Sequence, residues 1–285
     1  PFAKLYVQNL NANDFLAGGT RLDRNRTALR GGLGFRARQK LGPALFKASY
    51  EWATRLPRAD EVFGDNQLLA PNLELQPERS HNANLGARLD VKKAGSWRFE
   101  LDGFVRATEQ LIVLLGTEQV LRFQNVNDAV SVGVAAAASW SLRQDVLRIS
   151  LNTTYFNFRN SSSDGNFGSF NGDRIPNRPY FFGNASAAFR WPDLLAHGDE
   201  WSLYWDSRYV HGFFRGWESA GLTAFKQTVD AQLAHSVGAR VAARVSYVRT
   251  TFAVDLMNLT DARLFDFLGV QRPGRSRCFK VTAEL

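Results

Sequence analysis

Long runs in which apolar and polar residues alternate constrain this chain most. The clearest run covers residues 96–106. Its apolar face is formed by Trp97, Phe99, Leu101, Gly103 and Val105. Its polar face is formed by Arg98, Glu100, Asp102 and Arg106. Because successive side chains of a strand point to opposite faces, this period of two predicts β-strands with one apolar and one polar face.

The same pattern predicts about twelve strands along the chain. We place them at 2–10, 28–40, 44–56, 79–92, 96–110, 127–142, 145–159, 178–191, 200–214, 223–237, 243–259 and 275–285. Several exceed the roughly 5–6 residues usual in globular proteins and reach the ~9–11 that a tilted membrane-spanning strand needs. A soluble sandwich also gives such alternation, so the pattern alone does not decide between the two.

The lengths of the connections are the second clue. Long connections are predicted at 11–27, 57–78, 111–126, 160–177, 215–222 and 260–274. Short ones are predicted at 41–43, 93–95, 143–144 and 238–242, with 192–199 somewhat longer. Outer-membrane barrels combine long extracellular loops with short periplasmic turns, so this rhythm favours a barrel with both termini on the short-turn side. Aromatic residues near strand ends favour the same interpretation: Trp97, Trp140, Tyr155, Trp191 and Trp201.

Composition excludes several other classes of protein. The longest candidate for an apolar helix, residues 130–140, falls short of the ~18–20 residues that a membrane helix needs. Cys278 is the only cysteine and cannot form an internal disulfide. The formal charge of +8 comes from scattered Lys and Arg residues, so no nucleic-acid partner is predicted. The four histidines lack zinc-site spacing, and no hydrolase elbow or cofactor motif is present.

Two stretches carry motifs of a known family. The first, Ala53 to Val91, holds Arg55, Pro57, Glu61, Phe63, Asn72, Leu75, Pro77 and Glu78. The second, Ala253 to Leu285, holds Asn258-Leu259-Thr260-Asp261, Phe265 and Arg272-Pro273-Gly274-Arg275. Both resemble signatures of TonB-dependent outer-membrane receptors, the second being the one that ends the penultimate strand and opens the last. The chain departs from the family pattern at Asn84, Thr260 and Leu285, where a glutamate, an aromatic and a terminal aromatic are common.

The resemblance implies an all-β fold, an antiparallel transmembrane β-barrel in which residues 1–285 form one partial domain. Barrels of this family have about 22 strands, so these strands are expected to be the carboxy-terminal half of a longer protein that also has a plug domain. The implied location is the bacterial outer membrane. The implied function is energy-coupled uptake of a scarce ligand such as an iron-siderophore, cobalamin or a glycan, without enzymatic activity.

The same resemblance implies the partners. They are outer-membrane lipid, the plug domain, the TonB system, a small-molecule or glycan ligand, and the barrel-assembly machinery, which would read the last strand. No cofactor is expected.

Two groups of side chains are candidates for function. Polar residues near the expected extracellular mouth could meet an anionic ligand: Arg55, Arg58, Asn72, Arg174 and Arg178. Charged residues on predicted strands are expected to face the lumen and contact the plug or a ligand: Arg98, Arg106, Arg148, Asp206, Arg208, Lys226 and Asp230. Structural ion pairs in a wet lumen are the alternative for any residue of the second group. Acids and amides at 160–173 lack the spacing of a calcium loop, so no metal site is predicted.

Two other functions stay open on the sequence alone. A complete twelve-strand outer-membrane pore or enzyme would require the strands to close on themselves. A receptor-like barrel that serves as a structural subunit of an outer-membrane complex would require partner chains against its wall or loops.

Overall fold

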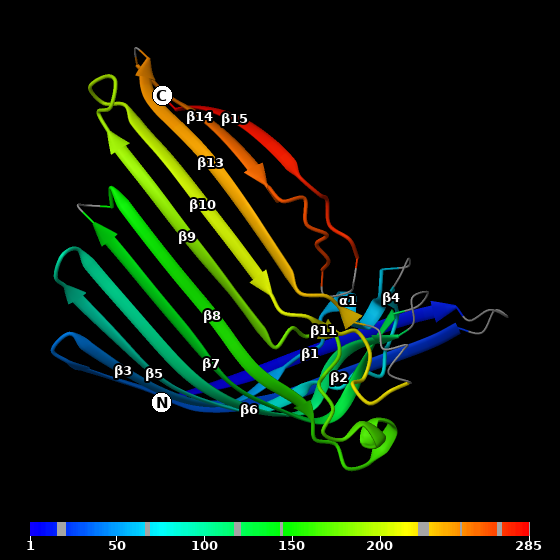
Figure 1. Cartoon of the computed structure of the whole chain (residues 1–285). Helices are drawn as coiled ribbons and strands as arrows, with labels where there is room; N and C mark the ends of the chain where they lie inside the picture. The colour runs from blue at the N-terminus through cyan, green and yellow to red at the C-terminus, as the bar shows by residue number, and fades with distance from the viewer. Residues whose placement is uncertain are drawn as a thin grey trace.

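One large antiparallel sheet dominates the computed structural model, which describes residues 1–15, 21–65, 69–116, 121–142, 145–221, 228–245, 247–266 and 270–284 (Figure 1). Twelve long strands form it, each hydrogen-bonded to the next long strand along the chain. They are β1 (Phe2–Phe15), β2 (Arg21–Leu41), β3 (Ala44–Arg55), β5 (Glu78–Lys92), β6 (Ser96–Gly116), β7 (Leu121–Leu142), β8 (Leu147–Asn160), β9 (Phe181–Pro192), β10 (Glu200–Val210), β13 (Gln232–Val245), β14 (Val248–Met257) and β15 (Ser276–Glu284). The predicted all-β antiparallel fold is confirmed.

The remaining elements are short and lie in the long connections. They are α1 (Ala59–Phe63), β4 (Leu69–Ala70), the 3-10 helix η1 (Gly165–Phe170), β11 (Phe213–Phe214) and β12 (Thr228–Val229). β4 pairs in parallel with the start of β7, and β11 pairs with β12. Among the described helices, none has the length and apolar character required to cross a membrane.

The two faces of the sheet differ as the alternation predicts. We call the face that carries Lys47, Glu100 and Asp102 the inner face; there Lys47 lies 3.5 Å from Glu100 and 3.4 Å from Asp102. The opposite, outer face carries large apolar side chains that no other part of the described chain covers, such as Leu101, whose side chain is 55% exposed. An uncovered band of this kind is typical of a wall that faces lipid.

The sheet is an open wall. In the described residues β1 and β15 each pair with a single neighbour, so the twelve long strands do not close on themselves. The closure that a complete twelve-strand pore or enzyme requires is therefore not seen. Both termini lie at the end of the sheet that carries the short turns, as predicted, and the long connections gather at the other end (Figure 1).

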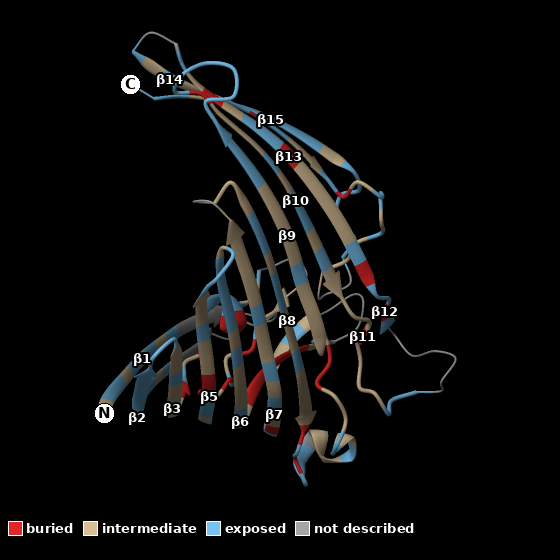
Figure 2. Ribbon diagram, turned by 60° about the vertical axis from the view of Figure 1, so that its left-hand side comes forward, coloured by how far each residue is buried: buried red, intermediate tan, exposed pale blue. Residues whose placement is uncertain are grey.

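Most of the buried residues lie at the long-loop end, where they form two clusters (Figure 2). One cluster contains Leu111, Val113, Val126, Ala129 and Ile175. A second contains Val62, Leu75 and Ile112. Both form where connections fold back against the ends of β6 and β7, so this end has a conventional hydrophobic core while the rest of the wall has none.

Two predicted loops are wrong, because their strands continue. β6 and β7 stay paired through Gly116 and Leu121, so most of the predicted loop at 111–126 is a hairpin. Its residues 111–114 are buried because connecting segments cover both of its faces. Similarly, β1 and β2 extend across most of the predicted loop at 11–27, whose centre, residues 16–20, lies outside the described residues.

The strand predicted at 223–237 is also wrong in position. β13 begins at Gln232 and runs through the turn predicted at 238–242. Gly238, within the predicted turn, lies opposite Tyr204 in the sheet, and a Cβ atom there would come within 2.2 Å of the tyrosine ring. Gly238 therefore makes room for a ring rather than reversing the chain.

Gly133 gives a test of this packing. It lies between Phe104 and Phe156 on neighbouring strands, and a Cβ atom would come within 2.5 Å of each side chain. We expect Gly133→Ala to lower the free energy of unfolding by about 1–3 kcal/mol because the added methyl group overpacks the space between the two phenylalanines. Urea unfolding of the full-length protein measures the change. Gly31→Ala is the matched control, since a Cβ atom there meets nothing within 4 Å; equal stability of the two variants would contradict this packing.

Candidate ligand-binding site

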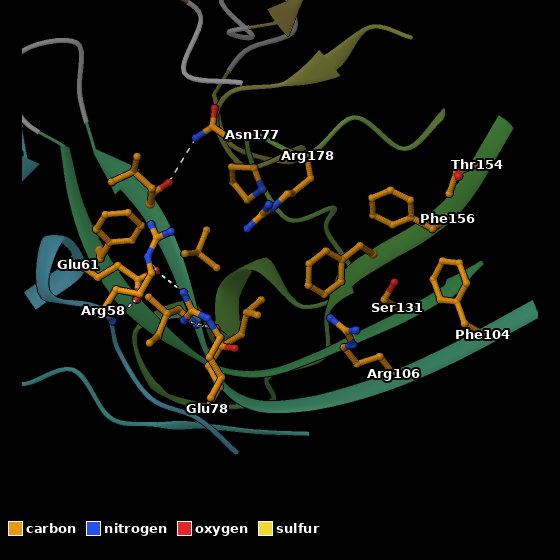
Figure 3. A pocket seen from close by; sticks show the side chains of 18 residues that line it. Arg58, Glu61, Glu78, Phe104, Arg106, Ser131, Thr154, Phe156, Asn177 and Arg178 are labelled. Carbon is orange, nitrogen blue, oxygen red and sulfur yellow. Dashed lines mark hydrogen bonds and ion pairs between the residues drawn. The ribbon is translucent and has the colours of Figure 1, made fainter. Parts of the chain in front are cut away.

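A cavity of about 590 Å³ opens on the inner face at the long-loop end (Figure 3). Its wall is formed by β6, β7 and β8, and its rim by the connections that follow β3 and β8. In Figure 3, Arg58 and Glu61 lie on one side of the cavity and Phe104 on the other. The cavity is thus built jointly by strands and by loop segments.

The rim is held by a carboxylate network. Arg55, the last residue of β3, forms ion pairs with Glu61 of α1 and, at 3.2 Å, with Glu78. The same Glu78 oxygen accepts the backbone N–H of Ile112 at 2.7 Å. Glu61 also accepts the Arg58 backbone N–H at 2.9 Å and lies 3.6 Å from the Arg58 guanidinium. These contacts tie α1 to β3, β5 and the buried part of β6.

The connection after β8 forms the opposite rim. Ile175 is buried, and the side-chain amide of Asn177 donates to the Leu114 carbonyl at 3.3 Å. The Asn177 backbone N–H donates to the Phe214 carbonyl at 2.8 Å. This anchoring places Arg178 at the cavity wall.

The guanidinium groups of two of the cavity's four arginines have no hydrogen bond or ion pair within the described part of the chain. Arg106 lies on the inner face of β6, and Arg178 lies in the loop before β9. Burial lowers the pKa of Arg178 from its ordinary value, while the nearby Glu78 charge opposes the shift. An arginine starts from a pKa so high that it stays charged near neutral pH.

The charge and the walls of the cavity suit one class of ligand. Four arginines and two glutamates line it, which leaves a formal net charge of +2. Phe104, Phe123, Phe156 and Phe158 supply apolar walls. A guanidinium group donates two parallel hydrogen bonds to a negatively charged group, and an aromatic ring packs against a planar one.

The structure distributes the five predicted mouth residues unevenly. Arg55, Arg58 and Arg178 line the cavity. Asn72 is buried and donates to the Phe123 carbonyl at 2.7 Å, so it fastens the loop to β7. Arg174 lies over the Tyr180 ring, 3.9 Å from its centroid, and does not line the cavity.

The seven predicted lumen residues also separate. Arg106 lines the cavity. Arg98 pairs with Asp90 at 2.8 Å and Arg148 with Asp145 at 2.7 Å, near the short turns. Asp206 and Arg208 lie exposed on β10. Asp230 lies in the connection before β13, which corrects its predicted strand position, and Lys226 lies outside the described residues.

Sequence reasoning missed the aromatic walls. Phe104 lies on the inner face of β6, between Asp102 and Arg106. Phe156 lies on the inner face of β8, the face that also carries Arg148. Applying the period of two to every residue of these strands, apolar residues included, would have assigned both rings to the inner face. Ile112 and Leu114 were beyond reach because their segment was predicted to be a loop. Among the described residues no group of three or more His, Cys, Asp or Glu side chains could hold a metal ion.

Glu78 gives a test of the rim. In Glu78→Gln the amide oxygen can still accept the Ile112 N–H, but the ion pair with Arg55 is lost. Because Arg55 then keeps only its ion pair with Glu61, we expect a loss of about 1 kcal/mol and faster hydrogen exchange in residues 58–64. Glu109→Gln, at an exposed position without an ion pair within the described chain, is the control. Unchanged exchange in Glu78→Gln would contradict the anchoring role.

Comparisons with solved structures identify the fold. The copper transporter OprC is similar with a TM-score of 0.69 at 20% identity, over 96% of this chain and 42% of that one. The ferric preacinetobactin receptor BauA of Acinetobacter baumannii gives 0.63 at 14% identity, over 92% of this chain and 37% of that one. The ferric enterobactin receptor PfeA of Pseudomonas aeruginosa, determined as a mutant, gives 0.61 at 17% identity, over 99% of this chain and 44% of that one. The chain thus spans less than half the length of each.

Sequence comparison gives the family. No curated protein sequence matches the chain. The family model described as "TonB dependent receptor-like, beta-barrel" matches residues 4–259, which is most of the chain. The motifs around Arg55 and Asn258, the antiparallel wall and this match agree: the chain belongs to the TonB-dependent receptor family and forms part of its β-barrel.

Proposed function

We propose that this chain is the wall of an outer-membrane receptor that takes up a scarce, negatively charged metal chelate with energy relayed through TonB. The observation that supports this most is the cationic, aromatic-walled cavity on the inner face of a receptor-family barrel. Membership of the family favours transport, and the chemistry of the cavity favours an anionic ligand. No covalent step is needed, so the proposed protein is not an enzyme.

The ligand class follows from Arg106 and Arg178. Each carries a guanidinium group with no hydrogen bond or ion pair in the described chain. Each can therefore donate to ligand oxygens without breaking an existing contact. The rings of Phe104 and Phe156 are placed to pack against a flat chelating group. Similar proteins are named as receptors for ferric preacinetobactin and ferric enterobactin, and one as a copper transporter. The cationic and aromatic lining therefore favours an iron-siderophore with anionic aromatic groups over cobalamin or a neutral glycan.

The rest of the receptor is also proposed. Residues 1–285 would form one barrel domain that is completed by further strands at β1 and β15, with outer-membrane lipid against the outer face. A plug domain would contact the inner face, where Arg98, Arg148, Asp206 and Arg208 lie. The last strand, β15, would be read by the barrel-assembly machinery.

Uptake by cells that carry the full-length gene tests the proposal. Radioactive iron is supplied as an anionic tris-catecholate complex and, in parallel, as a cationic hydroxamate complex. We expect saturable uptake of the anionic complex that stops when the proton gradient is collapsed. Uptake that ignores the gradient, or equal uptake of both complexes, would contradict the proposal.

Substitution of the two free cations tests the binding site. A charge-assisted hydrogen bond contributes about 1.5–3 kcal/mol, so Arg106→Ala and Arg178→Ala are each expected to weaken binding of ferric enterobactin roughly 10-fold to 100-fold. Tryptophan quenching of the purified full-length protein measures the affinity. Arg263→Ala removes an exposed arginine on the same side of the molecule, outside the cavity, and is expected to change nothing. Loss of affinity in all three variants would point to general charge rather than to this cavity.

A further inference from the structure

The turn between β9 and β10 displays two leucines at the short-turn end. Residues 193–199, which we call the leucine turn, separate Pro192 from Glu200. The Leu194 side chain is 53% exposed and that of Leu195 is 76% exposed. A single exposed leucine is unremarkable, but two in sequence on a short turn form an apolar tip.

The leucine turn is fixed from within by its two carboxylates. Asp199 accepts the backbone N–H groups of Leu194 at 2.8 Å, Leu195 at 3.0 Å and Ala196 at 2.9 Å. Asp193 accepts the Gly198 N–H at 2.5 Å, and its own N–H donates to the Asp199 carbonyl at 2.9 Å. Both charges point back toward the backbone, so the leucines are held outward at a fixed position.

The same carboxylate joins the leucine turn to the aromatic band of the outer face. The indole N–H of Trp201 donates to Asp199 at 3.1 Å. Trp201 lies directly opposite Trp191 in the sheet, and Trp191 stacks on Phe189 with ring centroids 5.6 Å apart. Indole rings prefer the boundary between lipid headgroups and hydrocarbon. Asp199 therefore fixes the leucines relative to side chains that mark this boundary.

The hydrogen bonds also keep the carboxylate charged. Desolvation acts to raise the pKa of Asp199, but the donors from Trp201 and the backbone outweigh it and hold the pKa below its ordinary value. The Asp199 carboxylate therefore stays an acceptor for the backbone N–H groups that shape the turn.

The neighbouring hairpin extends the apolar tip. Tyr247, between β13 and β14, is 89% exposed. This hairpin is next to the leucine turn because β10 pairs with β13 along its whole length (Figure 1). The hairpin and the leucine turn are tied together by Glu200, which lies 2.6 Å from Arg190 and 3.7 Å from Arg249.

We propose that the leucine turn is a membrane anchor whose leucines insert into the lipid leaflet on the short-turn side of the barrel. Its continuity with Trp191 and Trp201 favours lipid over a protein partner, because the tip begins where the interfacial aromatics end. Insertion into lipid would remove the two leucine side chains from water, which stabilises the inserted position in proportion to the apolar area that is buried. The inference rests on the proposed membrane location of the barrel.

Spin labels at three positions test the anchor in the full-length receptor, reconstituted in vesicles of phosphatidylethanolamine and phosphatidylglycerol. Cys278→Ser removes the native thiol, and single cysteines are then introduced as Leu195→Cys, His197→Cys and Leu203→Cys. His197 shares the turn but is polar and fully exposed, so it is the matched control. Leu203 lies on the outer face of β10 and reports on the membrane band itself. Collision with oxygen, which concentrates in lipid, is compared with collision with a water-soluble nickel chelate.

We expect the oxygen-to-nickel ratio at position 195 to be severalfold higher than at 197 and to approach that at 203. Adding Asp199→Ala, which frees the backbone of the turn, should lower the ratio at 195 and leave that at 203 unchanged. An aqueous label at 195 with a lipid-exposed label at 203 would overturn the anchor and leave the proposed function intact. Aqueous labels at both positions would instead contradict the membrane location itself.

Discussion

Backbone pairing with a period of two is the constraint on which the rest of this structure depends. Each long strand satisfies its neighbours' hydrogen bonds, so every second side chain must face one side of the wall. On β6 this puts Leu101 outside and Arg106 inside. The inner face can therefore carry charged and aromatic side chains while the outer face stays apolar, because inward-facing and outward-facing residues occupy alternate positions.

The cavity exists because the wall is extended at one end. β6 and β7 continue past Gln110, which adopts a left-handed backbone with φ of 56°, into a hairpin that is buried on both faces. Glu78 receives the Ile112 N–H of that hairpin and the Arg55 ion pair of β3 at one carboxylate oxygen. Local folding of the loops thus fixes the rim, while the pairing of the strands fixes the wall.

The features that could be predicted from the sequence are those that follow from the repeated alternation of apolar and polar residues. Alternation located the long strands, except that a turn was predicted at 238–242, within β13, where Gly238 makes room for the Tyr204 ring. The family motifs identified the architecture, and the structure shows why they are needed. Asn258 hydrogen-bonds in both directions with Ala262, and Asp261 accepts the Arg275 N–H that leads into β15.

The candidate site was only half predictable. Arginines at strand ends suggested an anionic ligand, and Arg55, Arg58 and Arg178 do meet in one cavity. Asn72 instead fastens a loop to β7, and Arg174 lies over the Tyr180 ring. Both roles depend on long-range contacts that no local sequence pattern encodes. The same holds for Ile112 and Leu114, whose burial comes from segments distant in sequence.

A fluorescence scan along β6 tests the central claim most directly. Single environment-sensitive labels are placed at each position from 97 to 106 of the full-length protein in vesicles that contain a quencher on the lipid chains. The account predicts strong quenching at the odd positions, such as Leu101, and little at the even positions, such as Asp102. Uniform quenching, or none at any position, would contradict a membrane wall with an inward-facing binding cavity.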